Sequence, residues 1–246
     1  MSYKKTARSV MFERMGILMK HKNLISLALA VLLTGVLAVS ACAESGIDAA
    51  TGAWEINQDP VSEEKNAQAQ TAIDKALETM TGADYEAVAV LGTQVVAGMN
   101  TCILCRVTPV VPDAVSQWAL VYLYEDLDGN AEITQVVDLM TAPEEGAVGG
   151  WMSNQGDEAL EADANAALET ALERMDGTDY EVIAVLGSQV VAGMNYRLLC
   201  WATPVVPDPE GSFCLVTVYQ GLDGNAEITE AADLEIAGGV LSGTEE

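Results

Sequence analysis

The sequence predicts an α+β fold of two tandem units, in each of which an antiparallel sheet wraps one helix. The second half of the chain repeats the first without a gap over its strand region, since adding 95 takes Tyr85 to Tyr180 and Asp128 to Asp223. Each copy begins with apolar residues at helical spacing and continues with runs of β-type alternation. Two long copies indicate two domains rather than a solenoid. We expect the domains to span residues 52–141 and 149–237.

The N-terminal segment has the features of an export signal. A basic stretch at residues 20–22 precedes an apolar run from Leu24 to Val39, and small residues follow. This order is typical of a secretory signal peptide, here residues 1–41. The apolar run is shorter than the roughly 20 residues that a membrane-spanning helix needs.

The end of this segment, Val39-Ser40-Ala41-Cys42, resembles a bacterial lipobox. The resemblance implies a lipid on Cys42, which would anchor the protein at the extracellular face of the bacterial cell membrane. Residues 42–51 are small or acidic and are expected to form a tether. The alternative is ordinary cleavage at the small-x-small site around Cys42, which would release a soluble secreted protein.

Charge and composition restrict the possible functions. The chain has 37 acidic and 11 basic residues and a formal net charge of −26, so it repels nucleic acids and anionic lipid head groups. Its single histidine, His21, lies in the export signal. The exported part therefore has no residue for Ser-His-Asp or Cys-His catalysis or for a histidine-based zinc site. We expect a protein that is not an enzyme, with no metal and no cofactor.

Each predicted domain opens with a short segment and a helix. The short segments contain Gly52 and Trp54 in the first copy and Gly149, Gly150 and Trp151 in the second. One interpretation is that each tryptophan anchors a first strand on the helix. It is compatible with a second one, in which the glycine contacts a partner while the tryptophan packs inward. The first helix is predicted over residues 62–80, and the apolar faces of the two helices are Ala72, Ile73, Ala76, Leu77 and Met80, and Ala167, Leu168, Ala171, Leu172 and Met175.

A hairpin with an apolar tip follows each helix. The two copies of its motif are Gln94, Val95, Val96, Ala97 and Gly98, and Gln189, Val190, Val191, Ala192 and Gly193. Glycines on both sides, such as Gly92 and Gly98, predict a glycine-bracketed bend. Hairpin tips usually carry Asn, Asp, Gly or Ser, so adjacent valines indicate a docking tip if they are exposed. The alternative is that both valines lie in mid-strand and are buried.

The last two strands of the first unit are expected over residues 117–126 and 131–139. They are joined by a tight turn at Asp128 and Gly129, which corresponds to Asp223 and Gly224 in the second unit. The turn lacks the sixth-position glycine and twelfth-position glutamate of an EF-hand loop, so we interpret it as a turn without calcium.

The cysteines of the strands have separate expected roles. Cys102 and Cys105 are three residues apart on one predicted strand and should point to opposite faces. Cys200 and Cys214 lie on successive strands, where they either form a disulfide or pack as small buried side chains.

The duplicated Gln-x-Val-x-Gly motif, placed after a helix and a strand, resembles the first inhibitory hairpin of the cystatins, and Gly149-Gly150-Trp151 resembles their N-terminal trunk. The resemblance implies two cystatin-like domains. In each domain the trunk, the first hairpin and the second hairpin would form a wedge that fills the active-site cleft of a papain-like cysteine protease. Binding would be reversible and non-covalent. The implied trunk residues are Gly52, Trp54, Gly149, Gly150 and Trp151, and the implied second-hairpin residues are Asp128, Gly129, Asp223 and Gly224.

One departure from the cystatin pattern supports a different function. Animal and plant cystatins usually carry Pro-Trp in the second hairpin, whereas this chain has Leu127-Asp128-Gly129-Asn130. Loss of an aromatic hot-spot residue lowers affinity. The alternative function is therefore a non-inhibitory cell-surface binding or adhesion module on the same scaffold, which the acidity of the chain also favours.

Overall fold

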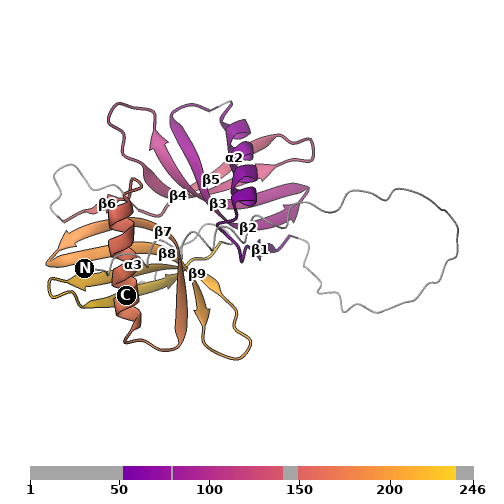
Figure 1. Ribbon diagram of the computed structural model, residues 1–246. Coiled ribbons are helices and arrows are strands. Elements are labelled where there is room, and N and C mark those ends of the chain that lie inside the picture. Colours follow the sequence, from indigo (N-terminus) through magenta and orange to yellow (C-terminus); the bar gives the residue numbers. More distant parts are fainter. Residues whose placement is uncertain (1–51, 79, 141–148, 237–246) are drawn as a thin grey trace, which may run out of the picture. The chain divides into compact units, whose positions relative to one another are not determined.

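The computed structural model describes residues 52–78, 80–140 and 149–236, which belong to one compact unit (Figure 1). The predictions for the signal peptide, the lipidated Cys42 and the tether lie outside these residues. The described part is α+β, with two five-stranded antiparallel sheets and two helices. The tandem arrangement of the sequence is compatible with this architecture.

The first half contains one helix and the strands of one sheet. In chain order its elements are β1 (Trp54–Ile56), α2 (Glu63–Leu77), β2 (Ala83–Val96), β3 (Gly98–Pro109), β4 (Gln117–Glu125) and β5 (Ala131–Asp138). The sheet has the simple order β1-β2-β3-β4-β5, with every neighbour antiparallel.

The second half repeats this order. Its elements are β6 (Trp151–Ser153), α3 (Glu158–Leu172), β7 (Thr178–Val191), β8 (Gly193–Pro204), β9 (Ser212–Gly221) and β10 (Ala226–Asp233). The sheet order is β10-β9-β8-β7-β6. The predicted succession of a short strand, a helix and four strands is thus present in both halves.

Both helices end earlier than the apolar periodicity predicts. Helix α2 ends at Leu77, where the Glu78 amide donates to the Lys75 carbonyl, a tightened last turn. Met80 and Met175 therefore lie beyond the helices and are each 46% exposed, so their placement on the buried face was wrong. The buried face of α2 consists of Ala69, Ala72, Ile73 and Ala76.

Gly92 does not flank the bend, contrary to the prediction, but lies inside β2. The pairing of β2 with β3 shifts register between Val90 and Gly92, which marks a β-bulge. A Cβ at Gly92 would meet the Glu55 carbonyl oxygen of β1 at 3.0 Å. The glycine therefore permits close approach of the neighbouring strand rather than a turn.

Each sheet buries both of its faces. On the helix face of the first sheet, Ile103, Cys105, Val121 and Leu123 pack with the buried face of α2. On the opposite face, the alternate residues Cys102, Leu104, Leu120 and Tyr122 join a cluster that also contains buried residues of the second sheet. Cys102 and Cys105 thus point to opposite faces, as predicted.

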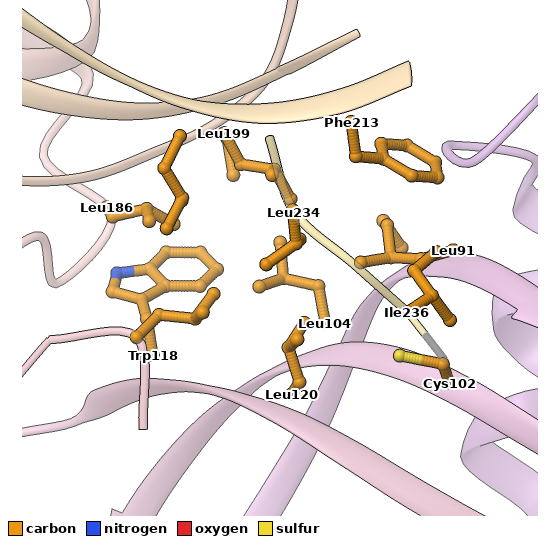
Figure 2. Close-up of a cluster of buried hydrophobic side chains, with 14 of the residues drawn as sticks. Leu91, Cys102, Leu104, Trp118, Leu120, Leu186, Leu199, Phe213, Leu234 and Ile236 are labelled. Atoms are coloured by element: carbon orange, nitrogen blue, oxygen red, sulfur yellow. The ribbon is translucent and has the colours of Figure 1, made fainter. Parts of the chain in front are cut away.

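We call the cluster on the face away from the helix the shared cluster, because both halves contribute to it (Figure 2). It contains Leu91, Cys102, Leu104, Trp118 and Leu120 from the first half and Leu186, Leu199, Phe213, Leu234 and Ile236 from the second. Trp54 and Trp151 pack against this cluster, and Trp54 makes an edge-to-face contact with Tyr122 at 5.8 Å between ring centroids. The expectation that the tryptophans anchor their strands on the helix was therefore wrong, because they lie on the face away from it.

Segments that follow the last strand of each half complete the shared cluster. Ile236, after β10, lies beside Gly92, and its carbonyl accepts a hydrogen bond from the Tyr122 hydroxyl at 3.1 Å. Met140, after β5, lies beside Gly187 of β7. The buried core of each half therefore includes side chains supplied by the other.

Candidate functional site

The duplicated motif forms the end of the β2–β3 hairpin. Val96 pairs with Gly98, Ala97 lies between the two strands, and Gly98 has a φ of +132°. The valines belong to the end of β2, yet Val95 is 58% and Val96 38% exposed. Their counterparts Val190 and Val191 are 54% and 42% exposed. The tips are therefore available to a partner, and the buried alternative was wrong.

The glutamine of the motif connects the hairpin to the trunk. Trp54 of β1 pairs with Gln94 of β2, and the Gln94 side-chain amide donates to the Gly52 carbonyl at 2.6 Å. The Asn100 side-chain amide donates to the Gln94 amide oxygen at 2.7 Å. Three segments are thus held together by one side chain, and the trunk glycine lies beside the hairpin.

The same connection exists in the second half. Gln189 donates to the Gly149 carbonyl at 2.7 Å and accepts from the Asn195 side-chain amide at 2.7 Å. Trp151 pairs with Gln189 in the same register as Trp54 with Gln94. Gly150 is the residue between Gly149 and Trp151 in the chain.

The second turn lies on the other side of the hairpin tip. Met99 of β3 pairs with Glu125 at the end of β4. The Tyr124 hydroxyl donates to the Ala97 carbonyl at 2.6 Å, and Tyr219 makes the same bond to Ala192. A Cβ at Gly98 would press against the Glu125 carbonyl oxygen, so only glycine lets the tip lie this close to β4.

Hydrogen bonds within the turn fix its shape in the first half. The Asp126 carboxylate accepts from the backbone amides of Asp128 and Asn130 at 2.9 and 2.8 Å. These bonds, led by those from Asn130, lower the pKa of Asp126. Gly129 has a φ of +79°, as the tight turn requires. The Asp126 oxygens are therefore used by the turn itself.

In the second half Gly221 takes the place of Asp126, and Asp223 supplies the carboxylate. Its oxygen accepts from the Asn225 backbone amide at 3.1 Å, and hydrogen bonds from Asn225 lower the pKa of Asp223. Gly224 has a φ of +80°. The two turns thus reach the same shape with different acidic residues.

The leucines of the second turns were not among the site residues predicted from the sequence. Leu127 is 86% and Leu222 89% exposed, more than any other large apolar side chain in the described residues. A lone leucine in an otherwise polar turn was the available signal. Each half presents what we call its docking edge, which consists of trunk, hairpin tip and second turn; its apolar members are Val95, Val96, Met99 and Leu127, and Val190, Val191 and Leu222.

The chemistry of the described residues suits binding. The four described cysteines are buried free thiols, and burial raises the pKa of Cys102 and Cys214 to about 12. Cys200 lies directly opposite Cys214 across β8 and β9. Among residues 52–236 as described, no group of His, Cys, Asp or Glu is arranged to hold a metal ion. No described helix is long and apolar enough to cross a membrane.

Comparisons with known proteins found no matching family model and no matching curated sequence.

Proposed function

We propose that the protein is an exported, lipid-anchored inhibitor of papain-like cysteine proteases, built from two cystatin-like domains whose sheets wrap their helices. Each docking edge would enter the active-site cleft of a protease as a wedge and block it reversibly without covalent chemistry. Cys42 would carry the lipid and hold the protein at the cell surface.

One observation carries this proposal. The trunk glycine, the Gln-Val-Val-Ala-Gly tip and the second turn lie next to one another at one end of the sheet, and the valines of the tip are exposed. This combination appears twice in the chain. Maintaining apolar side chains at a solvent-exposed tip is unfavourable for solubility and is accounted for by a docking role.

The second turn determines how strong inhibition can be. Leu127 and Leu222 replace the Pro-Trp pair that is usual in animal and plant cystatins. A leucine offers less contact area than a tryptophan and cannot supply its indole hydrogen bond. We therefore expect weaker inhibition than that of cystatins with an aromatic second hairpin.

The second candidate is a cell-surface binding module that uses the same edges. The exposed leucines favour it, because they are apolar contacts of a kind that the usual protease wedge does not use. In this case the docking edges bind a protein that is not a cysteine protease.

The decisive experiment titrates papain with the chain from Ala43 onward. We expect saturable, reversible inhibition that is lost in the double variant Val95→Asp and Val190→Asp, because burying an unpaired carboxylate in the protease cleft is unfavourable. The matched control is Val110→Asp with Val205→Asp. These valines are 64% and 62% exposed and follow β3 and β8, at the ends of those strands away from the tips.

The outcomes separate the two candidates. Inhibition that survives in the control and disappears in the tip variant supports the wedge. No inhibition by a folded sample at micromolar concentration, against papain and a panel of cathepsins, rejects the inhibitor and leaves the binding module. Equal loss in both variants would show a general effect of added charge rather than a docking tip.

A further inference from the structure

A groove opens on the helix face of the first sheet and has a volume of about 770 Å³. Its floor is apolar and consists of the buried residues Ala69 and Ala72 of α2 and Val90, Ile103 and Leu123 of the sheet. The apolar side chains that it exposes to solvent are those of Ile56 and Met99. Its rim is charged, with Glu55, Asp59, Lys65 and Glu125. The volume lies in the range of about 300–1,000 Å³ that is usual for small-molecule sites.

The groove exists because a tyrosine of the second half has a small counterpart here. Four residues in register form a row across the first sheet, namely Glu55, Thr93, Thr101 and Leu123. The corresponding row of the second sheet is Met152, Ser188, Tyr196 and Val218. Tyr196 is only 2% exposed and packs with the core beneath α3. Thr101 leaves that space open.

Positions next to this row also differ between the halves, and they too are packed in the second half and exposed in the first. Leu160 and Met194 pack against the core of the second half, whereas their counterparts Lys65 and Met99 are exposed and line the groove. Gln220 is the neutral counterpart of Glu125. Where the second half has packed or neutral residues, the first half thus has an opening with a charged rim.

The rim has an excess of negative charge. It contains three carboxylates and one ammonium group, and the Lys65 ammonium donates to the Asn57 side-chain oxygen at 2.6 Å. Within the described residues, the ion pair is that between Arg106 and Glu86, which lies outside the rim. No described basic side chain therefore forms an ion pair with the rim carboxylates. An apolar floor below unpaired carboxylates matches a ligand with a hydrocarbon body and a cationic head.

We propose that this groove binds a small amphipathic cation, namely an aliphatic or aromatic amine in its ammonium form. The hydrocarbon part lies over the floor and packs against the exposed side chain of Met99. The ammonium group lies at the rim beside Glu55. Tyr196 fills the equivalent space in the second half, so the described residues offer one site of this kind, and it does not depend on the inhibitor function.

Isothermal titration calorimetry with octylammonium tests the proposal, with octanol and octanoate as probes of equal chain length and different charge. We expect one octylammonium per chain and an affinity about fivefold or more above that of octanol, with octanoate weakest. Thr101→Tyr transfers the filling residue of the second half and should reduce octylammonium affinity at least tenfold. Glu55→Met introduces the neutral residue found at this position in the second half. It should lower the affinity for octylammonium to nearly that for octanol and leave the affinity for octanol unchanged.

Two matched controls complete the design. Tyr196→Phe keeps the second half filled and should leave the stoichiometry at one. Glu132→Gln removes an exposed carboxylate of β5 outside the groove and should leave the preference for the cation unchanged. The proposal is overturned if octanoate binds as tightly as octylammonium, or if folded Thr101→Tyr and Glu55→Met both bind octylammonium like the unmodified chain.

Discussion

Gly98→Ala should destabilise the protein more than a glycine-to-alanine change at an equally strained position. Gly98 and Gly82 both have positive φ values, +132° and +125°. A Cβ at Gly82 would meet no atom within 4 Å, whereas one at Gly98 would press against the Glu125 carbonyl oxygen and the Tyr124 ring. Comparing the two variants therefore separates the free-energy cost of backbone strain from the cost of the steric clash.

The expected magnitudes follow from these contacts. A non-glycine residue in a sparsely populated φ region costs about 1–3 kcal/mol. Alanine recovers about 0.4–1 kcal/mol by restricting the unfolded chain. These terms apply to both positions and largely cancel in the comparison. Forcing a methyl group against packed atoms adds about 1–3 kcal/mol at Gly98 alone. We therefore expect Gly98→Ala to be less stable than Gly82→Ala by about 1–3 kcal/mol.

Urea unfolding followed by circular dichroism measures this difference, and the second half provides a replicate. Gly193 has a φ of +132° and lies against the Gln220 carbonyl oxygen, whereas Gly177 has a φ of +111° and open space. Gly193→Ala should therefore exceed Gly177→Ala by a similar amount. If both pairs agree within about 0.5 kcal/mol, close packing of the tip against β4 and β9 is refuted.

Three further predictions concern the core, the tip and the thiols. Leu104→Ala, at a fully buried position of the shared cluster, should lower the free energy of unfolding by about 2–5 kcal/mol, and urea should unfold both halves in one transition. Separate transitions would contradict a common core. Tyr124→Phe removes the hydroxyl bond to Ala97 and should cost about 0.5–1.5 kcal/mol, measured in the same way; an unchanged stability would contradict it. At pH 8 the thiols of Cys102 and Cys214 should resist Ellman's reagent until urea is added, because a pKa of about 12 leaves roughly one thiol in ten thousand ionised.

The order of elements was predictable because each depends on local periodicity. Helical spacing predicted α2 and α3, a run of apolar and aromatic residues predicted β4, and a glycine turn predicted the β4–β5 hairpin. The exact helix end was not predictable, since Met80 continues the apolar spacing although the last turn has already closed at Leu77. The spacing of apolar residues predicts which face of a helix is buried, but it does not predict the residue at which the helical hydrogen bonds end.

The shared cluster could not be derived from the sequence. In β4 both alternating sets are apolar, Trp118 and Leu120 on one face and Val121 and Leu123 on the other, so the pattern indicates burial on both sides. It does not identify what covers the second face. That cover comes from residues more than sixty positions away, such as Leu186 and Phe213, and their pairing is a tertiary property.

The candidate site was predictable in part. The repeated motif identified Gln94 and Val95, but the role of the glutamine as a link to Gly52 required the pairing of β1 with β2. Leu127 was hidden because a turn is expected to be polar, and one apolar residue within it changes no periodicity.

The two proposed sites differ in copy number, and this difference makes them separable. The docking edge is present in both halves with the same hydrogen bonds from Gln94 and Gln189, so a chain offers two such edges. The groove lies where Thr101 stands in the place of Tyr196, which fills the equivalent space of the other half, so the described part of the chain offers one groove of this kind. A protease or other protein bound at an edge can therefore reach two copies per chain, whereas an amphipathic cation reaches one. Because Met99 borders both the groove and the tip, a bound cation that alters protein binding should act on the first edge alone, and Val95→Asp should abolish that effect while Val190→Asp leaves it.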